Sequence, residues 1–296
     1  MKKVLVTGGC GFIGSHLVDY LVKRGDTLVY VIDNMDTGKK ENCNHSEKVK
    51  YFFKDIRDIF SDEKMIQEFE GIEVVYHLAA LARIQPSFGR PCETVDVNVR
   101  GTTVVCDLAR KLGARVVYAG SSSYYGGVYL NPYSFTKWQG EEICKMYSEV
   151  YGLNTAIARF FNVYGVRHPK EGPYGTIVGI FERQFVSNEP LTVTGTGDQR
   201  RDFTHVSDIV TGLCAMAQIP LKGDVYNLGT GTNHSINELA SLYGTDRIYI
   251  PARPGEAWVT LADISKTKEE LKWAPKQTLK EYVTSWVNKN GKQRLL

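Results

Sequence analysis

The sequence lacks several features that would place it in common protein classes. Its six cysteines are scattered and none forms a C-x-x-C pair. A disulfide framework or zinc site is therefore not indicated, and a reduced cytoplasmic protein without a bound metal is expected. No apolar run approaches the length of a membrane span. The opening Met-Lys-Lys leads directly into a strand pattern, which gives no sign of a signal peptide.

Charge of one sign is also scarce. The formal net charge is +3, with no long run of either sign, so neither nucleic acid nor a membrane is expected as a partner. Internal repeats and low-complexity segments are absent from the sequence. What is present is the composition of a soluble globular protein, with 43% hydrophobic and 23% charged residues. A chain of 296 residues can form roughly two domains.

The amino-terminal segment has the pattern of a dinucleotide-binding unit. Residues 3–7 (KVLVT) predict a buried parallel strand, and the glycine-rich turn GGCGFIG follows. A helix pattern covers residues 15–24. In this context the glycines indicate a turn that lets a helix N-terminus face a pyrophosphate, rather than a purely structural turn. The turn residues expected at the cofactor are Gly8, Gly11, Phe12, Ile13 and Gly14.

Asp33 indicates which dinucleotide is bound. It ends the second strand pattern, over residues 27–32, and Asn34 follows with no basic residue before Lys39. A carboxylate at this place accepts hydrogen bonds from the adenosine ribose and repels a 2′-phosphate. We therefore predict NAD rather than NADP, the alternative being that Asp33 is a simple turn residue.

A third strand pattern, over residues 50–53, precedes Asp55 and Ile56. Two interpretations stay open for this pair. They could border an adenine, or they could serve equally well as a helix cap and a core residue.

Two later strand patterns, over residues 73–77 and 115–119, end at the same predicted sheet edge. Arg83 lies beyond the first, at the expected rim of a cleft, although a lone arginine is more often a solvated surface group. The second delivers Ser121 to the edge at which such sheets bind ligands. The small residues expected close to the cofactor after the first strand are Leu78, Ala79 and Ala80.

Tyr133 and Lys137 are separated by four positions in a predicted helix that begins after Asn131-Pro132. They would lie on one helix face, where the ammonium should lower the pKa of the phenol. A phenolate can accept a proton from an alcohol, and Ser121 could bind the same oxygen. Alone, the pair is a weak signal, because an ordinary amphipathic helix surface gives the same spacing.

Motifs along nearly the whole chain resemble those of the extended short-chain dehydrogenases/reductases, within the nucleotide-sugar epimerase and dehydratase group. The matching elements occur in family order. They are TGGCGFIG, Asp33, DIRD at 55–58, HLAA at 77–80, Asn98, SSSYYG, PYSFTK, FFNVYG at 160–165, RRDFTHVSD at 200–208, NLGTG at 227–231 and LADISK at 261–266.

The resemblance implies a role for each matching residue. Tyr133 would be the acid/base, Lys137 would bind the nicotinamide ribose, and Ser121 would hold the substrate hydroxyl. Asn98 would lie at the cofactor. Further substrate contacts are implied at Ser122, Ser123, Asn162, Arg201 and Arg253 for the sugar and diphosphate, Glu256 for the ribose, and Leu191 and Val193 along the base. A surface ion pair is the alternative role for either arginine.

One segment departs from the family pattern. Family members usually carry a longer insertion before the PYS sequence, whereas only GVYLN separates Gly126-Gly127 from Pro132 here. That insertion normally forms a wall of the sugar pocket, so its shortness bears on the substrate and not on the cofactor.

The expected fold is an α/β, doubly wound parallel sheet of the Rossmann type with a smaller C-terminal α/β lobe. Residues 1–165, with about 204–228, would bind NAD, and residues 166–203 and 229–296 would bind the nucleotide sugar. A homodimer is also implied, formed by long helices that begin near Val95 and Pro132. Residues at helical spacing that could form the dimer face are Val104, Leu108, Ile143 and Tyr147.

The expected activity is NAD-dependent 4-epimerisation of a UDP-hexose or UDP-N-acetylhexosamine through a 4-keto sugar. The related dehydratases need an Asp-Glu pair, and the decarboxylases a glutamate, where this chain has Ser122 and Ser123. Those activities are the alternatives, together with a non-catalytic NAD-binding module. Thr260 occupies the position that borders the sugar's 2-substituent in similar epimerases, where a threonine would leave space for an N-acetyl group.

Overall fold

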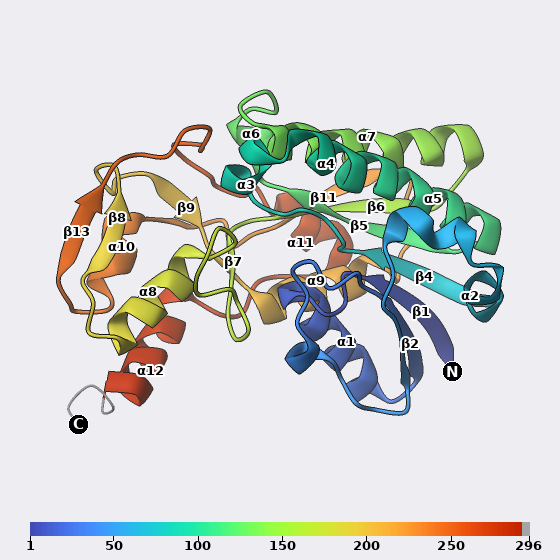
Figure 1. The fold of residues 1–296 in the computed structure, drawn as a ribbon, viewed down its shortest axis with the longest axis horizontal. Helices are drawn as coiled ribbons and strands as arrows, with labels where there is room; N and C mark the ends of the chain where they lie inside the picture. The colour runs from blue at the N-terminus through green and yellow to red at the C-terminus, as the bar shows by residue number, and fades with distance from the viewer. Residues whose placement is uncertain (292–296) are drawn as a thin grey trace.

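A seven-stranded parallel sheet organises the molecule, and the computed structural model describes residues 1–291 (Figure 1). The strand order is β11-β6-β5-β4-β1-β2-β3. The chain therefore adds strands outward from β1 first on one side, through β2 and β3, and then on the other side from β4 onward, so the order of addition reverses between β1 and β4. This reversal is the switch point at which doubly wound sheets bind ligands. The strands are β1 (Lys2–Thr7), β2 (Thr27–Ile32), β3 (Val49–Phe52), β4 (Ile72–His77), β5 (Arg115–Ser121), β6 (Thr155–Phe160) and β11 (Asp224–Leu228).

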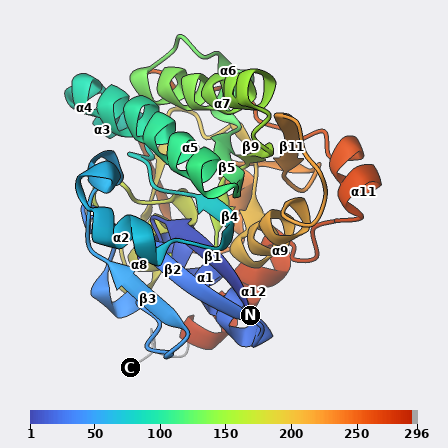
Figure 2. The same ribbon diagram turned by 90° about the vertical axis from the view of Figure 1, so that its right-hand side faces the viewer.

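Helices cover both faces of this sheet, as Figure 2 shows. Val4 and Val6 of β1 point to one face and Leu5 to the other, because successive strand residues alternate. The first face carries α1 (Phe12–Arg24), α9 (Val206–Met216) and α11 (Ser265–Leu271). The second carries α2 (Glu63–Glu68), α5 (Gly101–Leu112) and α7 (Pro132–Tyr151).

A second hydrophobic core forms the outer lobe at one end of the molecule (Figure 1). It is built on short strand pairs and three helices. The pairs are β8 (Leu191–Thr194) with β13 (Arg247–Ile250), β9 (Arg200–Asp202) with β12 (Asn233–Ser235), and β7 (Val163–Tyr164) with β10 (Thr204–His205). The helices are α8 (Ile177–Val186), α10 (Ile236–Ser241) and α12 (Leu279–Gly291).

Short elements fill the connections at the ligand-binding edge. They are η1 (Lys40–Asn42), η2 (Ile56–Ser61), α3 (Ile84–Gly89), α4 (Pro91–Val95), the π-type turn η3 (Asp96–Arg100) and α6 (Ser123–Gly126). None of the helices among residues 1–291 is both long enough and apolar enough to cross a membrane.

The expected fold class is confirmed by the sheet order, but one segment belongs elsewhere than predicted. Leu271 and Trp273, at the end of α11 and just after it, join the core on the sheet, whereas residues 229–296 were assigned to the outer lobe. The α11 helix follows the lobe strands in sequence but returns to pack on β11 and α9. The rest of the predicted division stays a prediction, and residues 292–296 lie outside the described residues.

Two of the four residues predicted for the dimer face are buried within the chain and cannot form it. Leu108 and Tyr147 are buried in the core between the sheet and its helices, and Val104 and Ile143 pack against that same core. Leu108 and Tyr147 therefore pack on their own sheet, whereas Val104 and Ile143 stay partly exposed. A homodimer stays a prediction, without an assigned face.

Candidate active site

A cavity of about 710 Å³ lies at the carboxyl ends of the sheet strands and extends to the outer lobe. Parallel strands end at the same sheet edge, so residues that are distant in sequence meet there. Most of the residues predicted for the site line this cavity. Among residues 1–291, no group of three or more His, Cys, Asp or Glu side chains is arranged to hold a metal ion.

The glycine-rich turn after β1 leaves the space that a pyrophosphate requires. Gly8 has a φ of +73°, and a Cβ there would lie 2.8 Å from the backbone nitrogen of Ala79. A Cβ on Gly14 would lie 2.1 Å from the carbonyl oxygen of Gly8, so α1 can approach β1 only without that carbon. The free N-terminus of α1 then faces the cavity, as an anion-binding helix end does. All five predicted turn residues line the cavity, as do Leu78, Ala79 and Ala80.

Asp33 is held at the end of β2 with its carboxylate at the cavity wall. Its Oδ2 accepts a hydrogen bond from the Cys10 backbone at 2.9 Å, and its Oδ1 accepts one from Met35 at 2.8 Å. Burial raises the pKa of Asp33, and the two backbone donors oppose this effect. The side chain is therefore fixed before any ribose is bound.

The helix-cap and core roles of Asp55 and Ile56 are confirmed, and the adenine contact stays a prediction that their place at the cavity permits. Asp55 caps η2 by accepting the backbone N–H of Arg57 at 2.9 Å, and it also lines the cavity. Ile56 is buried in the core and lines the cavity as well.

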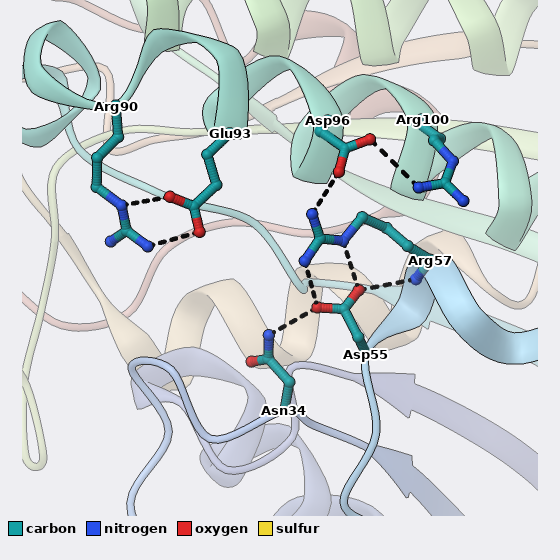
Figure 3. Close-up of polar contacts among 7 residues, drawn as sticks. All are labelled: Asn34, Asp55, Arg57, Arg90, Glu93, Asp96 and Arg100. Carbon is teal, nitrogen blue, oxygen red and sulfur yellow. Dashed lines mark hydrogen bonds and ion pairs between the residues drawn. The ribbon is translucent and has the colours of Figure 1, made fainter.

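Arg57 was not predicted, and Figure 3 shows its guanidinium between Asp55 and Asp96. It donates to both carboxylate oxygens of Asp55, at 2.8 and 2.9 Å, and Asn34 donates to the same carboxylate at 2.9 Å. The pKa of Asp55 is lowered to about 2, mainly by the Arg57 hydrogen bonds. The signal that could have revealed Arg57 is its place between two acids in DIRD.

Asn98 does not line the cavity, which corrects its predicted cofactor contact. Its Oδ1 accepts the backbone N–H of Leu81 at 2.8 Å, while its Nδ2 donates to the Leu81 carbonyl and to Thr136. Asn98 therefore ties the chain after β4 to α7, and its polar atoms are used in doing so.

Ser121 and Tyr133 meet at the centre of the cavity. Ser121 ends β5, and its Oγ accepts hydrogen bonds from Tyr133 Oη at 3.4 Å and from Ser123 Oγ at 2.9 Å. Tyr133 lies in the first turn of α7, which begins with a proline after the Asn131 cap. This cap fixes where the helix starts and therefore where the phenol points.

Lys137 lies one turn further along α7 and is only 4% exposed. Its Nζ lies 4.2 Å from the ring centroid of Tyr118, a cation–π contact. Burial lowers the pKa of Lys137 to about 8. The buried ammonium is thus held at the cavity wall in an environment that disfavours its charge.

The expectation that Lys137 lowers the pKa of Tyr133 is not met. Burial of the phenol is the largest effect and raises its pKa. The hydrogen bond to Ser121 and the positive charge of Arg83 lower it. Arg83 is thus a cavity residue that acts on Tyr133, and not a solvated surface group.

The predicted sugar and diphosphate contacts also line the cavity, with two exceptions. Leu191 and Val193 are 0% exposed and belong to the core of the outer lobe, so their side chains cannot border a base. Strand alternation in β8 directs Thr192 and Thr194 to the cavity instead, and this alternation was the available signal. The predicted residues that do line it are Arg83, Ser122, Ser123, Asn162, Arg201, Arg253, Glu256 and Thr260.

The turn that carries Arg253 and Glu256 packs on the shortened loop. Asn131 Nδ2 donates to the Gly255 carbonyl at 2.9 Å. A Cβ on Gly126 would lie 2.6 Å from that of Ala257. This turn therefore forms part of the cavity wall next to the shortened loop.

Comparison with known proteins agrees with this geometry. Residues 4–229 match the model of the NAD dependent epimerase/dehydratase family. The chain is 35% identical to a putative UDP-glucose 4-epimerase of Methanocaldococcus jannaschii, over 98% of this chain and 99% of that protein. It is 34% identical to UDP-glucuronic acid decarboxylase 1 of Arabidopsis thaliana, over 97% of this chain and 69% of that protein.

Among solved structures, the chain is similar to UDP-glucose 4-epimerase of Thermotoga maritima with UDP-glucose. The TM-score is 0.89 and the identity 30%, with 99% of this chain and 100% of that chain covered. NAD is therefore the cofactor, and the glycine turn and the Asp33 carboxylate fit it.

We expect Asp33 to select NAD over NADP, because its fixed carboxylate would repel a 2′-phosphate. NAD should bind about 10-fold or more tightly than NADP, and Asp33→Asn should narrow that ratio. Isothermal titration calorimetry with NAD and with NADP measures this ratio of affinities. Asp26→Asn, a change on the exposed approach to β2, serves as the control. Comparable affinity of the parent protein for the two nucleotides would contradict the assignment.

We also expect the buried charge of Lys137 to lower the stability of the nucleotide-free protein. The pKa falls from 10.5 to about 8 on folding, so the unfolded chain binds more protons between these values. The free energy of unfolding should therefore rise with pH across this window. Lys137→Met should raise it by about 1–3 kcal/mol at pH 7, and the gain should vanish near pH 10.5.

Urea unfolding at several pH values tests this expectation. Lys145→Met, on the same helix but pairing with Glu142 at the surface, should show no such pH dependence. A loss of stability in Lys137→Met at pH 7 would show that the ammonium is well accommodated.

Proposed function

Because the chain belongs to the NAD-dependent epimerase/dehydratase family, we propose that it is a nucleotide-sugar 4-epimerase. The substrate would be a UDP-hexose or a UDP-N-acetylhexosamine. The observation that carries the proposal is the meeting of Ser121 and Tyr133 at 3.4 Å in a cavity with no carboxylate at Ser122 or Ser123.

Ser121 would hold the sugar 4-hydroxyl, and Tyr133 as phenolate would accept its proton. Arg83 and the Ser121 hydroxyl favour the phenolate against the effect of burial. Bound NAD supplies the acceptor for the hydride of that carbon. Tyr133 would then act as the acid and return the proton to the 4-oxygen, while a hydride returned to C4 from the opposite face would invert that carbon.

The outer lobe would hold the nucleotide. We assign the diphosphate to Asn162, Arg201 and Arg253, since guanidinium groups bind phosphates in a bidentate manner. Arg201 and Glu256 form an ion pair at 3.5 Å, which supports adjacent positions for the proposed diphosphate and ribose contacts.

Elimination of water or loss of a carboxylate needs an acidic side chain that Ser122 and Ser123 do not offer. Glu141 approaches the backbone nitrogen of Ser121 at 3.5 Å, but it pairs with Arg159 at 2.6 Å and does not line the cavity. Both groups of this pair are buried, and the Glu141 carboxylate is occupied by Arg159 away from the cavity. These contacts favour epimerisation over the dehydratase and decarboxylase alternatives.

Tyr133→Phe tests the proposal. It removes the titrating oxygen and keeps the ring, so turnover should fall about 100-fold or more while NAD binding persists. The assay follows UDP-glucose and UDP-N-acetylglucosamine by NMR, which separates an epimer from a dehydrated or decarboxylated product.

Tyr129→Phe is the matched control, since Tyr129 is 82% exposed in the preceding loop. Near-parent turnover in Tyr133→Phe would exclude Tyr133 as the acid/base. No turnover of any sugar by the parent protein would favour a binding module instead.

We further propose that Thr260 admits a 2-N-acetyl group. Thr260 is 6% exposed at the cavity wall, and its Oγ1 accepts hydrogen bonds from Asn162 at 3.1 Å and from the Asp202 backbone at 3.3 Å. The Thr260 hydroxyl therefore holds the cavity wall by its hydrogen bonds, and the small size of the side chain leaves space for the 2-N-acetyl group.

Thr260→Tyr should lower kcat/KM for UDP-N-acetylglucosamine about 10-fold or more relative to UDP-glucose. Thr260→Val is the control, because it removes the hydroxyl without adding bulk and should affect both sugars alike. Parallel kinetics on the two sugars measure the ratio. Equal losses in Thr260→Tyr would show that the residue is not a size gate.

A further inference from the structure

A buried ion pair lies behind the reacting groups and joins three elements around Ser121. Glu141 is on α7, about two turns beyond Tyr133 on the same helix face. Arg159 is on β6, in register with Gly120 of β5. Its Nη2 donates to Glu141 Oε2 at 2.6 Å, and its Nε donates to the same oxygen at 3.0 Å. The two side chains, of Arg159 and Glu141, are 7% and 1% exposed, so the pair is shielded from solvent.

The Glu141 carboxylate reaches the end of β5 because two glycines let the helix and the strand approach each other. A Cβ on Gly140 of α7 would lie 2.1 Å from Tyr118 Oη. A Cβ on Gly120 of β5 would lie 2.8 Å from Glu141 Oε1. That same oxygen lies 3.5 Å from the backbone nitrogen of Ser121, as the acceptor of a long hydrogen bond. The ion pair therefore contacts the backbone of Ser121 itself.

Arg159 also holds the segment that follows Ser121. Its guanidinium carbon lies 3.5 Å from the centre of the Tyr124 ring and 5.0 Å from that of the Tyr125 ring, both on α6. In the same turn, the Ser121 hydroxyl accepts hydrogen bonds from the backbone N–H of Ser123 at 3.2 Å and from Ser123 Oγ at 2.9 Å. The chain is thus fixed on both sides of the serine hydroxyl, at its own backbone nitrogen and at α6.

A reacting hydroxyl must be held close to its productive position, since a misplacement of about 1 Å can lower a rate about 100-fold. We propose that Glu141 and Arg159 are positioning residues that hold the Ser121 hydroxyl against Tyr133. This inference rests on the proposed function, because it takes these two hydroxyl groups to act on the sugar 4-hydroxyl. Neither member of the ion pair is among the described residues that line the cavity, so both would act through Ser121 and not by touching a ligand.

The Tyr133 phenol reports whether the ion pair acts on the site, because groups from three elements face it. Its Oη donates to Ser121 Oγ of β5 at 3.4 Å. Burial raises the pKa of Tyr133, the Ser121 hydrogen bond and the charge of Arg83 ahead of α3 lower it, and the charge of Glu141 on its own helix raises it. Lys137 lies between Tyr133 and Glu141 on the same face of α7.

Arg159→Met tests the proposal, because it keeps an unbranched side chain without the charge or the planar group. In NAD-loaded protein with carbon-13 at the tyrosine Cζ atoms, the NMR signal of Tyr133 is identified by its absence in Tyr133→Phe. Its titration midpoint should move to higher pH in Arg159→Met, because Ser121 is displaced and any charge left on Glu141 is unpaired. In the epimerase assay, kcat should fall about 10-fold or more, while KM and the affinity for NAD change by less than about threefold.

Two further variants complete the design. Tyr124→Leu removes the ring that stacks on Arg159 and leaves the ion pair in place. Tyr124 is 39% exposed, so this variant should fold even if Arg159→Met does not, and it should show the same two effects at smaller size. Arg115→Met is the control, since Arg115 begins β5 at the opposite end of the strand and donates to backbone carbonyls that follow α9. It should change neither the Tyr133 titration nor kcat.

An unchanged Tyr133 titration in the variants that fold would overturn the inference, as would an unchanged kcat where the parent protein turns over a sugar. Parallel losses in kcat, sugar affinity and NAD affinity would also overturn it, because they would assign the ion pair to general stability. Turnover by the parent protein is measured separately. Its absence, together with a shifted Tyr133 titration, would contradict the proposed epimerase and leave the positioning of Ser121 standing.

Discussion

The close approach of β1 and β4 at the switch point is the constraint on which the site depends. Thr7 Oγ1 lies 2.7 Å from His77 Nδ1 and accepts the backbone N–H of Ala79 at 3.2 Å. Across the ring, His77 Nε2 lies 3.0 Å from Thr102 Oγ1 on α5. Burial lowers the pKa of His77 to about 3, so the ring is neutral and serves as a buried connector. Gly8 is required beside Ala79 for the same reason, because a side chain there would separate the two strand ends and close the phosphate cradle.

Burial shifts the pKa of several ionisable groups that line the cavity. Lys137 and Arg83 have lowered pKa values and Tyr133 a raised one, and in each case burial is the largest cause. Partial burial of these groups beside α3 and α7 lowers their hydration, which strengthens each remaining electrostatic interaction. The nucleotide-free protein therefore holds these side chains at a cost in stability, as functional sites often do.

The shortened loop before α7 contacts the turn that carries Arg253 and Glu256. Asn131 both caps α7 and donates to Gly255, so one residue fixes the position of Tyr133 and of the turn that carries Arg253 and Glu256. The turn of residues 253–257 thus lies against the start of α7. The sugar end of the cavity is consequently shaped by residues from both ends of the chain, and Arg83 lies at this junction.

The sequence by itself predicted the parallel sheet, the glycine turn and Asp33 from local periodicity and spacing, whereas the Ser121, Tyr133 and Lys137 group was a weak signal that only the family resemblance singled out. Only the tertiary structure decided the rest. Asn98 bonds inward to the backbone of Leu81, while Leu191 and Val193 point into the core of the outer lobe. Leu108 and Tyr147 pack on their own sheet. In each case the partner of an apolar or amide side chain is chosen by packing and not by spacing. The pKa of Tyr133 was likewise decided by the tertiary structure. Helical spacing places Lys137 nearby, but only the fold determines how far the phenol is buried and that Arg83 lies close enough to act on it.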